Sequence, residues 1–440
     1  MSTGVTLPFF ALGVSPGPRV GAEDPEGKDA LERLVRDGVN LVRLPAIDWP
    51  QLEGSEPAAD QLPPTVQAAA DQLDWARRVE DAIGRPVRVA VNLGQLSTLD
   101  GNAIRQRWLD FIVERFRHHP ALGVWKALDE PNNPYLSDDE ERRTHQELIA
   151  GYSRLREHDP QHPVWLTFAP QPARRVTARY FRRYRRAADV FAVDLYPVSE
   201  PMGKHSGIRN RQPSAVGDFA DRLTVAARER SGGGLPSWVW MVLQGAAWSG
   251  TIPRDERRRP IGPCLLQPTA AMVRYMTYQA IIHGAQGLLT FGMNVGLHTA
   301  MQPFGWDWDF WRGAVAPVLR ELTAPQLAPA LATIVAPDGA ATAANAHQVG
   351  GAGSNQLRVD TLSVTMADGT AILLAARRER RSGEQQQAAV DLPLEDRMAT
   401  ITGQAEVCFE GRMVATRGSA LRDTFLPHSV HVYRLRTTAP

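Results

Sequence analysis

Short apolar runs alternate with longer segments of helical periodicity, and this alternation restricts the possible folds more than any other feature. Eight strand-and-helix units within about 320 residues favour a parallel sheet, and eight favour a closed (β/α)8 TIM barrel over an open doubly wound sheet. The predicted strands are 9–15, 41–46, 87–94, 122–130, 164–170, 190–197, 238–246 and 287–294. Segments 28–38, 65–84, 104–120 and 272–287 carry apolar residues three or four apart, which predicts helices.

The pattern changes near residue 330, where the helical period fades. Segment 357–378 alternates apolar and polar residues and turns at Ala367-Asp368-Gly369, which predicts a hairpin. Segments 406–414 and 428–436 are predicted as further strands. A chain of 440 residues is also too long for one ordinary core. We therefore predict a barrel over 1–328 and a small antiparallel β domain, of the sandwich type, over 329–440.

Composition excludes several classes of function. With 43% hydrophobic residues, 22% charged residues and a net charge of +1, the chain is typical of a globular protein without a polyanionic partner such as nucleic acid. No apolar run is long enough to predict a membrane span. The first residues read as a strand and not as a signal peptide, so we expect a cytoplasmic protein, or a secreted or periplasmic one whose signal has been removed. Cys264 and Cys408 lack metal-site or disulfide spacing, and the strands carry almost no histidine, so no metal site is predicted.

Polar residues gather at the predicted carboxyl ends of the strands, where barrels of this kind place their chemistry. The period of two selects those that point inward. They are Arg43, Asn92, Asp194, Tyr196, Gln244 and Asn294, together with the end of "LGVWKALDEPNNP" (122–134), which carries Asp129 and Glu130.

Glu130 is the strongest catalytic candidate. A carboxylic acid at a strand end beside apolar walls can have a raised pKa and protonate a leaving oxygen. The alternative is a structural ion pair with Arg43. Regular pleating sends the adjacent Asp129 to the other face, so it joins the site only if the strand breaks at Pro131.

Tryptophans follow several strand ends. Trp49 follows the second strand, Trp248 the seventh, and Trp306 the eighth within "FGWDWDFW" (304–311). Aromatic faces beside carboxylates and amides suit a sugar, whose CH-rich face stacks on a ring while its hydroxyls need fixed hydrogen-bond partners. The alternative is that these rings pack in the core.

Residues 5–325 resemble the (β/α)8 glycoside hydrolases of clan A. The match is strongest in "VWKALDEPNN" (124–133), which is similar to the strand-4 acid/base motif that usually reads Asn-Glu-Pro. "AVDLYP" (192–197) and "WMVLQGAAW" (240–248) look like a looser group of glycosidase-like barrels, and the end of the β domain resembles a C-terminal sandwich attached to such barrels. The resemblance implies hydrolysis of O-glycosidic bonds in an oligo- or polysaccharide, with Glu130 as general acid/base and without a metal or organic cofactor.

The sequence departs from the clan pattern at two positions. Asp129 stands where Asn is usual, and Gln244 stands where the seventh strand should supply a nucleophilic Glu. Asp194 can be the second carboxylate, as a base at about 6.5–9.5 Å from Glu130 or as a nucleophile at about 5–5.5 Å. Asp255 or Glu256 is a second option. The third is a barrel that binds glycans without cleaving them.

The remaining polar and aromatic candidates are predicted to hold sugar hydroxyls, stack on the sugar or tune the two acids. They are Arg43, Asn92, Asp129, Tyr196, Gln244, Trp248, Asn294 and Trp306, with Glu200 and His205 as weaker candidates.

Overall fold

A computed structural model describes most of the chain. The described residues are 9–58, 60–133, 135–170, 173–203, 206–228, 238–249, 255–257, 265–335, 349–350, 358–366, 368–378, 387–394, 403–417 and 420–436. Ala367, His205 and Cys264, which entered the sequence predictions, lie outside these ranges.

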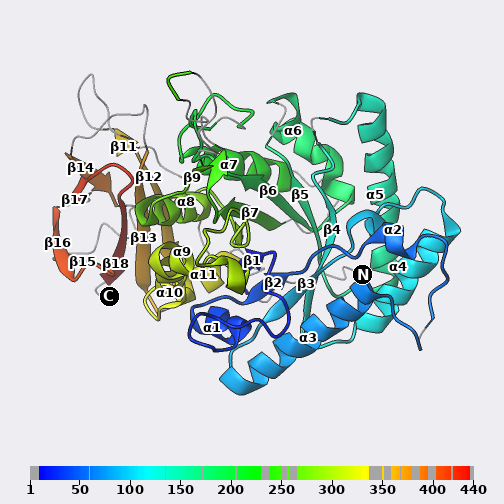
Figure 1. Ribbon diagram of the computed structural model, residues 1–440. Helices are drawn as coiled ribbons and strands as arrows, with labels where there is room; N and C mark the ends of the chain where they lie inside the picture. Colours follow the sequence, from blue (N-terminus) through cyan, green and yellow to red (C-terminus); the bar gives the residue numbers. More distant parts are fainter. Residues whose placement is uncertain are drawn as a thin grey trace.

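The first part of the described chain forms the predicted closed parallel barrel (Figure 1). All eight predicted strands are confirmed, and the barrel closes where β1 pairs in parallel with β10. Its strands are β1 (Ala11–Ser15), β2 (Leu41–Arg43), β3 (Arg88–Asn92), β4 (Leu122–Asp129), β5 (Val164–Phe168), β6 (Val190–Leu195), β7 (Trp238–Gln244) and β10 (Gly287–Phe291). A short hairpin of β8 (Trp248–Ser249) and β9 (Leu265–Leu266) follows β7.

Helices surround the barrel, and local signals set their ends. Gly84 ends the long helix α3 in the left-handed region, with φ of 71°, which glycine adopts without steric cost. Ser137 and Glu140 form a capping box at the start of α5. The helices are α1 (Ala30–Arg36), α2 (Trp49–Leu52), α3 (Pro64–Ile83), α4 (Ala103–Phe116), α5 (Asp138–His158), α6 (Ala178–Phe181), α7 (Ala215–Arg228), α8 (Ala270–Ile282), α9 (Trp308–Phe310), α10 (Ala316–Thr323) and α11 (Ala328–Val335).

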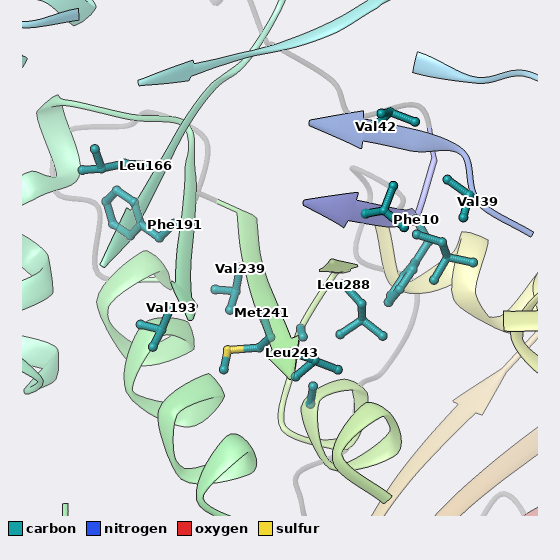
Figure 2. Packing of buried hydrophobic residues seen from close by; sticks show 14 of the residues in the cluster. Phe10, Val39, Val42, Leu166, Phe191, Val193, Val239, Met241, Leu243 and Leu288 are labelled. Atoms are coloured by element: carbon teal, nitrogen blue, oxygen red, sulfur yellow. The ribbon is translucent and has the colours of Figure 1, made fainter. Parts of the chain in front are cut away.

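Strand parity divides the barrel residues into two cores. Inward residues such as Leu41, Trp165 and Val242 pack against one another inside the barrel. Outward residues such as Met241 pack between the strands and the helices (Figure 2). Burying each such large side chain contributes roughly 1.5–3 kcal/mol. The period of two therefore predicted the inward positions of β6 and β7 correctly, as Ala192 and Val242 show.

The C-terminal part is an antiparallel β domain, as predicted. Its described strands are β11 (Val349–Gly350), β12 (Arg358–Thr365), β13 (Thr370–Arg378), β14 (Ala388–Pro393), β15 (Gln404–Val407), β16 (Arg412–Arg417), β17 (Ala420–Phe425) and β18 (Val430–Arg436). Hydrogen bonds link them into one continuous sheet in the order β11-β12-β13-β18-β15-β16-β17-β14, and the sandwich type of this domain stays a prediction.

The prediction of a single strand over 406–414 is wrong. The chain reverses between β15 and β16, with positive φ values at Phe409 (69°) and Gly411 (62°). Gly411 adopts this conformation freely, and the turn lets β15 and β16 pair antiparallel. Two short strands joined by a tight turn cannot be distinguished from one longer strand by alternation alone.

The β domain packs on the barrel through β12, β13 and β18, which lie beside α8 (Figure 1). Leu374 and Val432 join the same hydrophobic cluster as the outer face of the barrel. The predicted domain boundary between residues 328 and 329 falls within helix α11, and this boundary stays a prediction. Within the described ranges, no helix combines the length and apolarity needed to cross a membrane.

Candidate functional site at the carboxyl ends of the barrel strands

An irregularity in β4 brings Asp129 and Glu130 together. Lys126 pairs with Trp165 and Asp129 pairs with Thr167, so three residue steps on β4 face two steps on β5. This bulge reverses the side-chain parity, and Asp129 takes the inward face that Lys126 also occupies. The next residue, Glu130, has a φ of 49°, an uncommon conformation for a residue other than glycine.

Two contacts hold this strained strand end. The amide of Glu130 donates to the carbonyl of Thr167 at 2.9 Å. The fully buried Asn132 accepts from the amide of Ala169 and donates to its carbonyl, both at 2.8 Å. Residues in sparsely populated conformations cost about 1–3 kcal/mol and persist where surrounding contacts over-determine them. The ends of β4 and β5 are therefore fixed to each other.

Asp129 is part of a compact ion cluster. Arg43 donates to its Oδ2 at 3.1 Å and to Oγ of Ser15 at 2.9 Å. Lys126 lies 3.0 Å from its Oδ1. Burial by itself would raise the pKa of Asp129, but the charges of Lys126 and Arg43 outweigh it and hold the pKa below its ordinary value. The predicted ion pair of Arg43 is therefore formed with Asp129 and not with Glu130.

Glu130 and Asp194 lie close enough at the barrel mouth for each carboxyl to shift the pKa of the other. Burial, followed by the negative charges of Glu130 and Asp129, raises the pKa of Asp194 well above its ordinary value. Burial also raises the pKa of Glu130, and the negative charge of Asp129 adds to this effect, while the interaction with Asp194 opposes it. Two neighbouring carboxyls shielded from water do not both ionise readily, so the raised pKa of Asp194 favours one proton on the pair.

Oδ1 of Asp194 supports this assignment. It is buried and receives no hydrogen bond from an N–H or O–H group in the described part of the chain. A carboxylate oxygen in that position favours the protonated form of its carboxyl. On the other oxygen, Tyr196 donates to Oδ2 at 3.4 Å.

Three aromatic rings form a wall beside Asp194. The ring of Tyr196 stacks on Phe291, with centroids 5.1 Å apart and planes 16° apart. It also meets the ring of Trp248 at 5.0 Å, tilted by 58°. All three residues are half-buried, so the wall remains open on one side. Such a surface can stack against a flat apolar ligand face.

Gln244 and Asn92 are held by the backbone. Gln244 accepts from the amide of Val198 at 3.0 Å and donates to the carbonyls of Val198 and Ala246 at 3.0 and 3.1 Å. Asn92 donates to the carbonyl of Leu44 at 3.3 Å and accepts from the amide of Gly94 at 3.2 Å. Both amides therefore fix loops at the barrel mouth.

The remaining candidates lie apart from this group. Asn294 is exposed and lines a cavity of about 730 Å³ between the loop after β1 and residues 302–305. Trp306 is only 1% exposed and packs against Trp308 and Trp311, so in this structure it offers no free face to a ligand. Trp49 is also buried, with the guanidinium of Arg105 over its ring.

The other candidates for the second carboxylate lie in the loops after β6 and β7. Asp255 caps its own turn by accepting from the amide of Arg257 at 2.9 Å, and Glu256 is exposed. Glu200 is exposed in the loop after β6. No group of three or more metal-ligating side chains gathers among the residues that the structure describes.

Sequence reasoning missed Lys126, Asn132 and Phe291. Lys126 had a visible signal, because it is a charge within an apolar strand run. Phe291 had the weaker signal of inward parity with Leu289. Asn132 had none, because its two bonds to Ala169 depend on how β4 and β5 end beside each other.

The fold of this chain belongs to the class of (β/α)8 barrels, with carboxylates at its carboxyl face and an appended β domain. No protein-family model matches the sequence, and a comparison with curated proteins finds no match. Solved structures do match. One described as a glycoside hydrolase has 13% identity and a TM-score of 0.52, over 98% of this chain and 93% of that one.

Two further structures cover almost the whole of both chains. An α-amylase of Anoxybacillus has 9% identity and a TM-score of 0.53, over 99% of this chain and 100% of that chain. A GH27 β-L-arabinopyranosidase variant from Geobacillus stearothermophilus, in complex with arabinose, has 11% identity and a TM-score of 0.52, over 99% and 98%. At these identities the likeness establishes the fold that the three proteins share with this chain.

Proposed function

We propose that this protein is a glycoside hydrolase that cleaves O-glycosidic bonds of an oligo- or polysaccharide, with Glu130 as general acid/base and Asp194 as the second carboxylate. The observation that carries the proposal is a pair of neighbouring carboxyls, Glu130 and Asp194, at the carboxyl face of the barrel, where burial raises the pKa of both. Glycosidases need one protonated and one ionised carboxyl flanking the scissile bond. The three solved structures with the same fold are all glycoside hydrolases, which supports the same class.

The closeness of the two carboxyls indicates which role Asp194 takes. A general base needs room for a water, about 6.5–9.5 Å between the groups, whereas a nucleophile sits at about 5–5.5 Å. Carboxyls close enough to shift each other's pKa are nearer to the second arrangement, so we propose Asp194 as the nucleophile of a retaining reaction. Transfer of a proton from Asp194 to Glu130 then produces an acid at Glu130 and a carboxylate at Asp194.

The surrounding residues suit a sugar in this position. The wall of Tyr196, Trp248 and Phe291 would stack on the apolar face of the ring. Arg43 and Asp129 would present fixed polar atoms to hydroxyls at the opposite side of the carboxyl pair. We propose that Asn92 and Gln244 act by shaping the mouth, since their amides already bond to backbone. Asn294 and Trp306 remain candidates for a more distant part of the sugar chain.

The experiment is reducing-end release from a panel of polysaccharides and aryl glycosides. Glu130→Gln and Asp194→Asn should each abolish release that the unchanged protein shows. Glu256→Gln is the matched control, because it removes an exposed carboxylate outside the pair. Loss of release in Glu256→Gln alone would instead move the second carboxylate to the loop after β7.

One observation favours a second function, a barrel that binds glycans without cleaving them. The end of β7 presents Gln244, whose amide is fully used by backbone groups, where the resemblance leads one to expect a nucleophilic Glu. Absence of release from every substrate, with glycan binding intact in both Glu130→Gln and the unchanged protein, would establish this function.

A further inference from the structure

Lys126 is a fully buried cation that the proposed reaction does not use. The sequence contains only three lysines among its 49 basic residues, and this one lies inside the barrel. Its Nζ donates to the carbonyls of Ala127 and Leu128 at 2.8 and 3.2 Å and lies 3.0 Å from Oδ1 of Asp129. Its three N–H donors are therefore all engaged, and the ammonium also lies 5.2 Å from the centre of the Trp165 ring.

The charges around Lys126 can be counted. Arg43 contributes from β2, Lys126, Asp129 and Glu130 from β4, and Asp194 from β6. Tyr196, whose pKa is raised by burial and by the nearby carboxylates, stays neutral. The other inward polar groups here, Ser15, Asn92, Thr167 and Gln244, do not titrate in this range. The described cluster thus has two cations and three carboxyls.

Such a cluster is neutral when the three carboxyls hold one proton among them. The side chain of Asp129 is 43% exposed, but Lys126 is fully buried, and an unbalanced buried charge is costly enough that the groups beside it adjust their protonation. Arg43 and Lys126 both contact Asp129, which keeps that carboxyl ionised and leaves the proton to the other two.

We propose that Lys126, acting through Asp129, sets the number of protons on the Glu130–Asp194 pair at one and is thus a positioning residue of the site. Its meaning for catalysis rests on the proposed function, whereas the proton count does not. At neutral pH Lys126 is charged, because burial lowers its pKa only to about 8 while Asp129 opposes that change.

Charge counting gives a separate expectation for each variant. Lys126→Met leaves one cation, so the pair should hold two protons. Asp129→Asn leaves two cations and no ionised Asp129, so the pair should lose its proton. The double variant Lys126→Met/Asp129→Asn removes one charge of each sign and should return the pair to one proton. A merely structural role of Lys126 would not be rescued by removing Asp129.

The measurement is infrared difference spectroscopy of the carbonyl stretch of protonated carboxyls at neutral pH, with Asp194→Asn marking the band of the pair. The band should double in Lys126→Met, vanish in Asp129→Asn and return to its original intensity in the double variant. Lys28→Met is the control, since it removes an exposed lysine paired with Glu26 and should leave the band unchanged. Circular dichroism checks that each variant is folded.

An unchanged band in Asp129→Asn, which removes an accessible carboxylate, would overturn the proposal even if Lys126→Met failed to fold. In parallel, the acid limb of the pH profile for glycoside cleavage should move upward by about 1–3 units in Lys126→Met, because an opposite charge near a carboxyl lowers its pKa by that amount. If the carboxyl band changes as the charge count predicts but the protein has no glycosidase activity, the proposed function is refuted and this inference stands. If the protein is active but the band is the same in every variant, this inference is refuted and the proposed function stands.

Discussion

The buried histidine between barrel and β domain makes stability depend on pH in a calculable way. His283, at the C-terminal end of α8, lies 2.9 Å from Oδ1 of Asp221 and 3.3 Å from Oδ2 of the fully buried Asp360 on β12. Burial alone would lower its pKa, but the hydrogen bond to Asp221 and the ion pair with Asp360 outweigh burial and raise the pKa from 6.5 to about 9. The protonated imidazole therefore joins the two domains.

The sign of this pH dependence follows from the linkage between protonation and folding. A group whose pKa is raised on folding contributes stability that is complete below its unfolded pKa and is lost as the pH rises through its folded pKa. For His283 that window runs from 6.5 to about 9. At about 1.36 kcal/mol per pKa unit, the contribution is about 3 kcal/mol, present at pH 6 and absent at pH 10.

The assay is urea unfolding of the unchanged protein and His283→Gln at pH 6 and pH 10. Lys126 contributes with the opposite sign, because its pKa falls to about 8 on burial and folding becomes easier once it is neutral. The two proteins share this effect, so the difference between them isolates His283. The variant should be less stable by about 3 kcal/mol at pH 6 and nearly equal at pH 10. The reasoning is refuted if the difference is the same at both pH values, and His298→Gln, in an exposed pair with Asp309, should show no such difference.

Three further variants test other parts of the structure. Gln244→Glu should not create a working nucleophile, and urea unfolding should show a loss of about 1–3 kcal/mol, because a carboxylate would face backbone carbonyl oxygens that now accept from the amide. Gly151→Ala should cost at least about 1–3 kcal/mol, since its Cβ would lie 1.9 Å from the carbonyl oxygen of Ser97, while Gly313→Ala, with open space around the site, should be tolerated. Phe291→Leu should raise KM several-fold with little change in kcat, corresponding to about 0.5–1.5 kcal/mol of lost stacking, and a drop in kcat alone would contradict a binding role.

Much of the fold could be predicted because it depends on local periodicity. Each barrel strand is a short apolar run, and each neighbouring helix repeats its apolar residues every three or four positions. The same period of two selected Asp194 and Tyr196 as inward residues on β6, and the structure has Ala192 in the barrel interior as this parity requires. Where a turn interrupts an apolar run, as at Phe409, the period carries no signal and the prediction failed.

The aromatic candidates differ in exposure for a physical reason. Trp248 and Trp306 look alike in the sequence, since each follows a strand end. Trp248 lies half-exposed against Tyr196, whereas Trp306 is enclosed by two other tryptophans. Burial of a ring depends on the loops and helices that fold over it, and no local pattern contains that information.

The sequence by itself determined the eightfold alternation, the inward face of regular strands such as β6 and β7, and the carboxylate Glu130 at the end of β4. Only the tertiary structure decided that Asp129 joins the site, because the extra residue in β4 appears when β4 is aligned with β5. It likewise decided that Arg43 and Lys126 converge on Asp129 and that Glu130 meets Asp194. Periodicity is a property of one segment, whereas proton sharing depends on distances between segments that only the closed barrel sets.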